Sequence, residues 1–313
     1  MPLFSVIIPL YNKAIYIQET IESVLQQRFT DYEIIVVNDA STDESARIVS
    51  TISDARISLI ENEKNLGLSA TRNVGISNAK GSIIALLDAD DMWLPNFLET
   101  IKNLHDSFPE ASIYGTDYAE IYTTHKAIAS KKNISTSLKG TSFMVDNFFE
   151  ANMYQPIFNP SCLAFKKSIC DGAPVFDPAI TFSEDVDFYI KYGSQYKVAY
   201  HYEALVAMRF DVPDQMSRSN ISKKTLPNLD GYETLATENS SLKKFLDLYR
   251  YIYASLYYLE NAIPQKNKML KYVIYSNLTW KQRLLLKSPR FVLLLIKKIK
   301  GILMKFNIKV TSF

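Results

Sequence analysis

The stretch SIIALLDADD, residues 82–91, decides the fold that the sequence predicts. Its first six residues are almost all apolar, and its last four include carboxylates at positions 88, 90 and 91. A short, continuous apolar run is typical of a strand that is buried on both faces of a parallel sheet. We therefore expect a buried strand that ends in an acidic turn at the edge of such a sheet.

Apolar runs of the same kind occur on both sides of this stretch. Residues 4–8 and 33–37 are two further candidate strands, residues 56–60 form a weaker one, and residues 111–114 form a fifth. Because these runs are separated by longer segments, they indicate strands joined by crossover connections rather than by tight hairpins.

The connecting segments are helical in pattern. Residues 17–25 carry an apolar stripe at helical spacing, and residues 69–79 form another helical segment. Ser41 and Glu44 match a capping box for the helix that follows them, and Pro95 is at the favoured first position of a fourth helix. The alternation predicts an α/β fold with a doubly wound, Rossmann-like, mostly parallel sheet flanked by helices.

The rest of the chain has a different character. Residues 120–215 show no clean period, and we interpret them as the irregular half of the same domain. From residue 241 onward the pattern is helical again, with an apolar stripe that begins at Leu242. A C-terminal helical extension is therefore expected.

The net charge of +2 conceals two oppositely charged parts. Glu260 is the last acidic residue, and residues 261–313 contain 12 of the 35 lysines and arginines. The remaining 23 basic and 33 acidic residues lie in 1–260, so an acidic body precedes a basic tail. The N-terminus shows no signal-peptide pattern, and two cysteines are too few for a disulfide framework. A reducing cytoplasm is the expected compartment.

Polar residues follow three of the expected strands. Pro9, Tyr11 and Asn12 come after the first, Asp39 after the second, and the acidic turn after the strand at 82–87. In an open parallel sheet, ligands bind beyond the carboxyl ends of the strands, so these residues are expected to meet at one edge.

The acidic turn is the most informative of the three clusters. Neighbouring carboxylates repel one another, and a hard divalent cation such as Mg²⁺ or Mn²⁺ relieves that repulsion together with substrate phosphates. The alternative from the residues alone is a solvated acidic turn before the helix that Pro95 opens.

Four short motifs in a fixed order give the sequence a family resemblance. They are SVIIPLYN at 5–12, VNDASTD at 37–43, NLGLSATRNVG at 65–75 and LDADD at 87–91. In this order they resemble the signatures of family 2 glycosyltransferases, which have the GT-A fold. The segment SEDVDF at 183–188 is similar to that family's acidic catalytic segment. The resemblance implies inverting transfer of a sugar from a nucleotide diphosphate donor, with UDP the usual nucleotide.

The resemblance also implies roles for single residues. Asp39 would accept a hydrogen bond from the base, and Arg72 would lie near the diphosphate, where a guanidinium matches phosphate oxygens. Asp90 would bind the metal directly, and Asp88 would approach the metal or the ribose, with Mn²⁺ or Mg²⁺ as the cofactor. The full donor-binding set is Pro9, Tyr11, Asn12, Asp39, Arg72, Asp88, Asp90 and Arg209. Ordinary roles stay open at two of these positions: a loop-to-helix turn for Asp39, and an exposed helix surface for Arg72.

The proton of the acceptor hydroxyl needs a base. Asp185 matches the family's base position, with Glu184 beside it and Asp187 as a weaker candidate. The alternative is a helix whose first turn is simply acidic, which the helix dipole favours.

The acceptor side is less defined. Asp91 is a candidate acceptor contact, and Trp93 either forms an acceptor wall or is a buried aromatic. Family members often carry a histidine two residues after an arginine, and here Asp211 stands two residues after Arg209. A carboxylate there can bind a cation but repels phosphate, so a third protein ligand is in doubt. The resemblance divides the chain into a catalytic domain, residues 1–220, and a helical region, residues 221–313; residues 1–120 would bind the nucleotide and residues 121–220 the acceptor.

The basic tail combines lysine and arginine with leucine, isoleucine and phenylalanine. No apolar run in it approaches the length that spans a bilayer. A basic amphipathic helix suits an anionic membrane surface, and packing on the catalytic domain or on a second subunit is the alternative. Its apolar content argues against nucleic acid. A peripheral enzyme at the inner face of the cell membrane is expected, acting on a glycan or lipid-linked acceptor in surface polysaccharide synthesis.

Two other functions stay open. A sugar-phosphate nucleotidylyltransferase also presents a nucleotide to a doubly wound sheet, but it needs a glycine-rich loop that residues 9–12 lack. A non-catalytic nucleotide-sugar sensor or membrane scaffold would use the same pocket and need no base at Asp185. The sequence indicates neither the donor sugar nor an oligomeric state.

Overall fold

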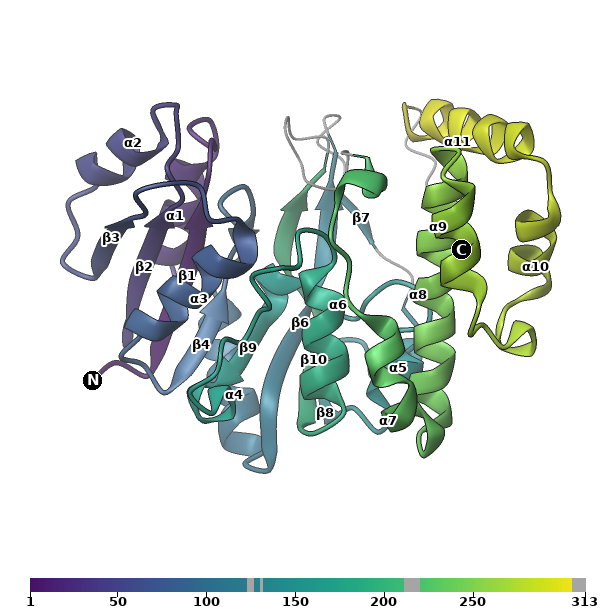
Figure 1. The fold of residues 1–313 in the computed structure, drawn as a ribbon. Coiled ribbons are helices and arrows are strands. Elements are labelled where there is room, and N and C mark those ends of the chain that lie inside the picture. Colours follow the sequence, from purple (N-terminus) through teal and green to yellow (C-terminus); the bar gives the residue numbers. More distant parts are fainter. Residues whose placement is uncertain (123–126, 130–131, 211–219, 306–313) are drawn as a thin grey trace.

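The computed structural model describes residues 1–122, 127–129, 132–210 and 220–305. Within them, ten strands form one continuous sheet (Figure 1). The strands are β1 (Phe4–Leu10), β2 (Tyr32–Asn38), β3 (Ile57–Glu61), β4 (Ile83–Leu86), β5 (Met92–Trp93), β6 (Ala111–Ile121), β7 (Ala127–Ala129), β8 (Ser142–Met144), β9 (Leu163–Lys166) and β10 (Lys197–Arg209). Their order is β3-β2-β1-β4-β9-β6-β10-β5, with β7 beside β6 and β8 beside β10.

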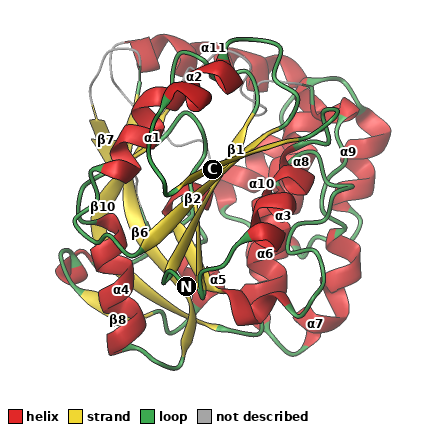
Figure 2. Ribbon diagram, turned by 90° about the vertical axis from the view of Figure 1, so that its left-hand side faces the viewer, coloured by secondary structure: helices red, strands yellow, loops and turns green. Residues whose placement is uncertain are grey.

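Helices cover both faces of this sheet. The α-helices are α1 (Ile17–Leu25), α2 (Ser45–Thr51), α3 (Leu68–Asn78), α4 (Phe97–Ser107), α5 (Phe148–Ala151), α6 (Glu184–Gly193), α7 (Glu233–Thr237), α8 (Ser240–Leu259), α9 (Ile263–Leu270), α10 (Trp280–Lys287) and α11 (Arg290–Lys305). Figure 2 shows α1 and α4 on one side of the sheet and α3 and α6 on the other. The predicted α/β fold with flanking helices is confirmed.

The predicted parallel strands pair as expected. Ile7 of β1 is opposite Ile35 of β2 on one side and opposite Leu86 of β4 on the other, and both pairings are parallel. Every residue of β1 and β4 is buried, which explains their unbroken apolar runs. In Figure 1, β1 starts near the N-terminus at the bottom, so these strands end toward the top of the view.

The segment interpreted as irregular contributes strands to the centre of the same sheet. β9 is antiparallel to both β4 and β6, and β10 lies parallel to β6 over most of its length. The register of β10 shifts between His201 and Ala204 and again before Val206. A register shift moves side chains to the opposite face, so a regular alternation could not appear in the sequence.

Two predicted helix starts are wrong. α2 begins at Ser45, and the Ser41 hydroxyl instead accepts a hydrogen bond from the Asn12 backbone N–H. α4 begins at Phe97, and the Pro95 carbonyl accepts a hydrogen bond from the Arg28 backbone N–H. Both residues are held by contacts with distant loops, which local helix signals do not reveal.

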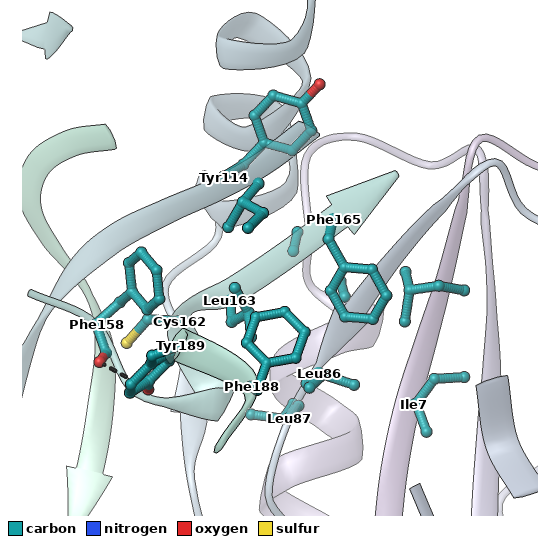
Figure 3. Packing of buried hydrophobic residues seen from close by; sticks show 14 of the residues in the cluster. Ile7, Leu86, Leu87, Tyr114, Phe158, Cys162, Leu163, Phe165, Phe188 and Tyr189 are labelled. Atoms are coloured by element: carbon teal, nitrogen blue, oxygen red, sulfur yellow. Dashed lines mark hydrogen bonds between the residues drawn. The ribbon is translucent and has the colours of Figure 1, made fainter. Parts of the chain in front are cut away.

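The core joins the sheet to the helices on one face. Ile7, Leu86, Phe165 and Phe188 come from β1, β4, β9 and α6 and are almost completely buried (Figure 3). The Tyr189 hydroxyl donates a hydrogen bond to the Phe158 carbonyl, 3.1 Å away, so even this buried phenol is satisfied.

Helix α3 approaches β1 closely because Gly75 has no side chain. A Cβ atom there would lie 2.4 Å from Cγ2 of Ile7, closer than packed carbon atoms can come. The glycine therefore lets the helix lie directly on the strand, which places the start of α3 beside the carboxyl end of β1.

The C-terminal helices begin inside the core and end outside it. Leu242, Phe245 and Leu246 of α8 are fully buried against the sheet domain. α9, α10 and α11 follow, with α11 at the end of the molecule toward which β1 and β2 run (Figures 1 and 2). Among the helices described, none has both the length and the apolar character needed to cross a membrane. The division of the chain at residue 220 stays a prediction.

Candidate active site

One cavity of about 640 Å³ lies beyond the carboxyl ends of β1, β2 and β4. The three polar clusters that follow these strands all contribute to its wall. Its lining includes Pro9, Leu10, Tyr11, Lys13, Asp39, Asn65, Leu66, Gly67, Ser69, Asp88, Asp90, Asp91, Ile180, Thr181, Arg209 and Lys224. The edge of the sheet therefore brings Asp39 into the same hollow as Asp88 and Asp90.

Asp39 shapes one wall of the cavity. Its Oδ1 accepts hydrogen bonds from Asn62 Nδ2 at 2.9 Å and from the Leu66 N–H at 2.8 Å, and its Oδ2 accepts from the Gly67 N–H at 2.9 Å. Gly67, at φ 87°, occupies the left-handed region that glycine tolerates, and it precedes α3. The carboxylate thus fixes the loop before α3 while it lines the cavity, and its lone pairs leave room for a further donor.

Residues 9–12, at the end of β1 and in the loop after it, have two different roles: some line the cavity, and one holds the loop in place. Pro9 and Tyr11 line the cavity, and Tyr11 is largely exposed. Asn12 does not line it: its Oδ1 accepts hydrogen bonds from the backbone N–H of Thr42, at 2.8 Å, and from the Thr42 hydroxyl. The expectation that Asn12 binds the donor is therefore corrected, because its side chain ties the loop after β1 to the loop after β2.

Arg72 lies in a buried cluster of ion pairs. Its side chain is 1% exposed, with NH2 2.7 Å from Asp88 Oδ1 and NH1 2.7 Å from Glu184 Oε1. Arg72 supports two carboxylates and is not among the residues that line the cavity, although its partner Asp88 is; its place near the diphosphate stays a prediction. Within the described residues, its buried Nε has no hydrogen-bond partner. The exposed-surface alternative is wrong.

Asp90 is held by cations of the protein. Lys13 Nζ lies 3.0 Å from Asp90 Oδ2, and Arg209 NH1 donates to the Asp90 carbonyl at 3.2 Å. Burial raises the pKa of Asp90, the Lys13 ammonium opposes that rise, and the charge of Asp88 adds to it. The repulsion expected in the acidic turn is therefore real, and protein side chains relieve part of it.

The acidic turn fits a hard cation only with help from other oxygens. Asp88 and Asp90 both face the cavity, and Asp88 keeps 31% of its side chain exposed. Within the described part of the chain, no group of three or more histidine, cysteine or acidic residues is arranged to hold a metal ion. Two carboxylates completed by phosphate and water oxygens is a donor set that suits Mg²⁺ or Mn²⁺.

Asp91 and Trp93 have structural contacts. Asp91 Oδ2 accepts a hydrogen bond from the Ser161 hydroxyl at 2.6 Å, and Oδ1 accepts one from the Arg209 backbone N–H at 3.0 Å. This carboxylate therefore connects the acidic turn to the segments that contain Ser161 and Arg209. Trp93 is 3% exposed, stacks on Phe97 and donates its indole N–H to the Ser161 carbonyl. Trp93 is outside the cavity lining, so the acceptor wall expected there is corrected to a buried aromatic.

Asp185 lies one residue beyond the Arg72–Glu184 ion pair. Burial and the charge of Glu184 raise the pKa of Asp185 to about 7, against the smaller opposing effect of Arg72. Asp185 Oδ1 accepts a hydrogen bond from the Val186 N–H, and Asp185 is not among the residues that line the cavity. A carboxyl with a pKa raised to about 7 has the electrostatic character of a general base, and Asp185 is connected to the cavity through Glu184, Arg72 and Asp88.

Asp187, the weaker candidate for the base, is engaged in a hydrogen bond within the protein. Asp187 Oδ1 accepts a hydrogen bond from the Tyr232 hydroxyl at 2.8 Å. Ser183, which precedes α6, has φ 62°, a left-handed conformation that sets the direction in which the helix leaves the cavity wall. The first turn of α6 is thus acidic, as expected, and the role of Asp185 as a base stays a prediction.

Two lysines that line the cavity were not predicted from the sequence. Lys13 follows the first motif directly, and Lys224 comes from the segment after β10. Neither belongs to a periodic pattern, and only the path of the loops brings them to the cavity. Asp211 lies outside the described residues.

The sequence matches a family and several curated proteins. The model of glycosyl transferase family 2 matches residues 5–171, more than half of the chain. An uncharacterized glycosyltransferase of Haemophilus influenzae is 29% identical over 211 residues, 66% of this chain and 65% of that protein. The glycosyltransferase GlyG of Streptococcus pneumoniae is 39% identical over 101 residues, 32% of this chain and 34% of that protein. The chain thus spans less than two thirds of either relative.

Solved structures share the fold. TarS residues 1–349 of S. aureus, in complex with UDP-GlcNAc, match with a TM-score of 0.60 and 18% identity, over 85% of this chain and 87% of that one. The same protein in complex with UDP matches with a TM-score of 0.56. The architecture is therefore the GT-A fold. On the family match, the chain belongs to glycosyl transferase family 2.

Proposed function

We propose that this chain is an inverting transferase that moves a hexosyl group from a UDP-sugar to a hydroxyl of a glycan or lipid-linked acceptor. The observation that carries the proposal is the single cavity in which Asp39, Asp88, Asp90 and Lys13 meet. A nucleoside diphosphate needs hydrogen-bond acceptors for its base and positive charge for its phosphates, and this cavity offers both.

The donor is proposed to lie along the carboxyl edge of the sheet. Pro9 and Tyr11 offer an apolar border for a base, and Asp39 an acceptor for a base N–H. The likeness to TarS, whose structure holds UDP-GlcNAc, supports uridine as the base. Lys13, Arg209 and Lys224 line the same cavity and supply the positive charge for the diphosphate.

The proposed metal ligands are Asp88 and Asp90. A bound Mg²⁺ or Mn²⁺ would offset the negative charge that gathers on the leaving diphosphate. Arg72 holds Asp88 at 2.7 Å and so fixes one of the two carboxylates before any ligand arrives. Because the acidic turn is positioned by Ser161 and Arg209 as well, little reorganisation is needed when the donor binds.

Asp185 is the proposed base. A group acts best in proton transfer when its pKa is close to the working pH, and about 7 meets that condition. Glu184, held by Arg72, contributes the neighbouring charge that raises the pKa of Asp185. In an inverting reaction the acceptor oxygen would lose its proton to Asp185 as it attacks the anomeric carbon from the face opposite the diphosphate.

A thermal-shift titration tests donor binding. UDP with Mn²⁺ is expected to raise the melting temperature, because a ligand that binds only the native state stabilises it. Asp90→Ala is expected to remove the part of the shift that depends on Mn²⁺, while Asp106→Ala, on the exposed face of α4, serves as a control. If UDP, GDP and dTDP all leave the melting temperature unchanged, the donor proposal is wrong.

We also propose that the reaction takes place at the inner face of a cell membrane, in surface polysaccharide synthesis. α10 and α11 pack one stripe inward, since Leu286 and Leu293 are buried. A second apolar stripe stays exposed, with Trp280 65% exposed, Phe291 68% and Leu295 54%. Both alternatives left by the sequence thus have support: these helices pack on the protein and still present apolar side chains.

The charge around this stripe points to anionic lipid. Residues 261–313 contain no acidic side chain, and lysines and arginines alternate with apolar residues along the sequence of α10 and α11. Phe291, Leu295 and Ile302 recur at helical spacing, so they share one face of α11. α11 also lies at the end of the molecule toward which β1 and β2 run (Figures 1 and 2), where the cavity is. A lipid-linked acceptor in the bilayer would therefore be on the side of the active site.

Vesicle sedimentation tests this location. The protein is expected to bind vesicles that contain phosphatidylglycerol and to bind pure phosphatidylcholine weakly, with binding reduced by salt. The double variant Phe291→Ser, Leu295→Ser is expected to lower vesicle affinity about tenfold or more, because each side chain loses roughly 1.5–3 kcal/mol of burial. Leu235→Ser, at an exposed position of α7, is the control. If the double variant and the control bind vesicles equally well, membrane docking is refuted. It is also refuted if the unaltered protein is a dimer and the double variant is a monomer.

A further inference from the structure

We propose that Lys13 binds the diphosphate of the donor and serves as a built-in cation that allows nucleotide to enter the cavity without a divalent metal ion. The proposal rests on the donor function above and assigns a residue that none of the family motifs includes. Three observations carry it: the fixed position of Lys13, its ion pair with Asp90, and the engagement of the neighbouring arginines.

The backbone of Lys13 is fixed on both sides. Its N–H donates to the Ser45 hydroxyl at 2.8 Å, and its carbonyl accepts from the N–H groups of Tyr16 and Ile17 at 2.9 and 3.0 Å. These contacts join the first turn of α2 to the start of α1. The side chain therefore leaves from a rigid point at the carboxyl edge of the sheet, rather than from a free loop.

The side chain reaches the acidic turn. Its ammonium lies 3.0 Å from Asp90 Oδ2, the side chain is 16% exposed, and both residues line the cavity. Among the described residues, Asp90 is the ion-pair partner of Lys13. An ammonium has three N–H donors, so one can hold Asp90 while the others face a phosphate oxygen.

The arginines nearby are less able to change partners. Arg72 is 1% exposed and holds carboxylates with both terminal nitrogens. Arg209 binds the Asp90 carbonyl with NH1 and Glu19 with NH2, and its guanidinium lies over the Tyr16 ring. Lys13 has a flexible four-carbon side chain with a compact charge, which suits contact with phosphate.

The charge of the cavity favours such a cation. Asp39, Asp88, Asp90 and Asp91 line it together with Lys13, Arg209 and Lys224, and an entering diphosphate adds further negative charge. Without a counter-charge, the carboxylates repel the ligand. A cation that already sits on Asp90 reduces this repulsion before any metal ion binds, so the metal ion is expected to strengthen UDP binding rather than to be essential for it.

Calorimetric titration with UDP, in EDTA and in Mn²⁺, tests the proposal. The unaltered protein is expected to bind UDP in EDTA. Lys13→Met is expected to bind it about 10- to 100-fold more weakly, the range for loss of a hydrogen bond to a charged group. Lys13→Arg keeps the charge, so its affinity for UDP is expected to stay within about threefold of that of the unaltered protein. The loss in Lys13→Met is expected to be smaller in Mn²⁺ and at high salt.

A charge-matched control separates contact from general electrostatics. Lys64→Met removes one positive charge from an exposed residue near the cavity that does not line it, so binding in EDTA is expected to change less than about twofold. Melting temperatures of all variants establish that they are folded. If Lys13→Arg binds as weakly as Lys13→Met, the charge is not what matters and the proposal is overturned.

The outcomes distinguish this proposal from the donor function. If the unaltered protein binds UDP only when Mn²⁺ is present, or if Lys13→Met binds it equally well in EDTA, Lys13 is not the built-in cation and the donor function stands. If the unaltered protein binds no nucleotide with or without Mn²⁺, both proposals fail.

Discussion

Two regions of this protein each enclose an almost completely buried arginine. Arg72, on α3, bridges Asp88 after β4 and Glu184 at the start of α6. Arg250, on α8, lies 2.8 Å from Asp230 and also contacts Glu233 on α7. Each side chain is 1% exposed, and each contacts carboxylates that lie on other segments of the chain.

The two clusters differ in where their carboxylates lie. Asp88 lines the cavity, and Glu184 is next to Asp185. The partners of Arg250 connect α7 to α8, and none of them lines the cavity. A buried ion pair is therefore not a mark of function by itself, because it also occurs as a support between helices. Its position relative to a cleft is what distinguishes the first cluster from the second.

The largest effect is expected from Asp185→Asn, beside the first cluster. Loss of a general base lowers turnover about 10²- to 10⁴-fold, while UDP affinity is expected to stay within about twofold, because Asp185 does not line the cavity. Turnover numbers and calorimetric affinities check this. Full turnover of the variant would show that Asp185 is not the base. UDP binding without any turnover by the unaltered protein would favour a nucleotide-sugar sensor or scaffold, which needs no base.

The pH dependence of the same residue gives a second expectation. The base acts when ionised, so turnover is expected to rise with pH through about 7 and then level off. The free energy of unfolding is expected to change with pH in the opposite direction. The pKa of Asp185 in the native state is above its ordinary value of 3.8, so between these two values the native state binds more protons than the unfolded state. The protein therefore becomes less stable as the pH rises through this range. Asp185→Asn is expected to melt about 2 °C or more above the unaltered protein at pH 8 and at nearly the same temperature at pH 4. An advantage that persists at pH 4 would contradict this assignment.

Arg72→Met is expected to lower both stability and turnover. It leaves two carboxylates without their cation, which costs about 3–5 kcal/mol of the free energy of unfolding in a buried pair. Misplacement of Asp88 and Asp185 is expected to reduce turnover about 10²-fold. Urea denaturation measures the first effect, and kcat, corrected for the folded fraction, measures the second. Unchanged kcat would mean that this cluster is only a support, like the second.

Arg250→Met is expected to lower stability alone. We expect the free energy of unfolding to fall by about 3 kcal/mol. Asp247 lies 3.9 Å from Arg250 and is fully buried, so it would lose one of its two cations, but its ion pair with Lys243 at 2.8 Å would remain. The kcat of the folded protein is expected to change less than about twofold, since separate regions act additively. A large loss of kcat would show that the second cluster is coupled to the first through α8, on which Tyr249 lies within electrostatic range of Asp185.

The sequence predicted the parts of the fold that depend on local pattern. Continuous apolar runs identified β1, β2 and β4, and their parallel pairing followed from the helices between them. β10 could not be predicted, because its register shifts past β6 remove the alternation that marks a strand.

The candidate site divides in the same way. The ends of parallel strands share an edge, so the meeting of Asp39, Asp88 and Asp90 was predictable. The two alternatives for Trp93 could not be separated from the sequence, because its burial depends on the pairing of β5 with β10, in which Trp93 is opposite Val206. Lys13 was missed because its approach to Asp90 depends on hydrogen bonds between loops. Long-range contacts of this kind leave no periodic trace in the sequence.

The antiparallel strand β9 has a consequence for how such a protein can be recombined. β9 separates β4 from β6 and forms hydrogen bonds with both. A gene fragment that encodes only residues 1–122 would leave the backbone of β4 as an open edge, and open edges pair with other chains and aggregate. Exchange of whole halves between related proteins is therefore disfavoured, and new specificities are more readily acquired by substitution within loops at the edge of an intact sheet.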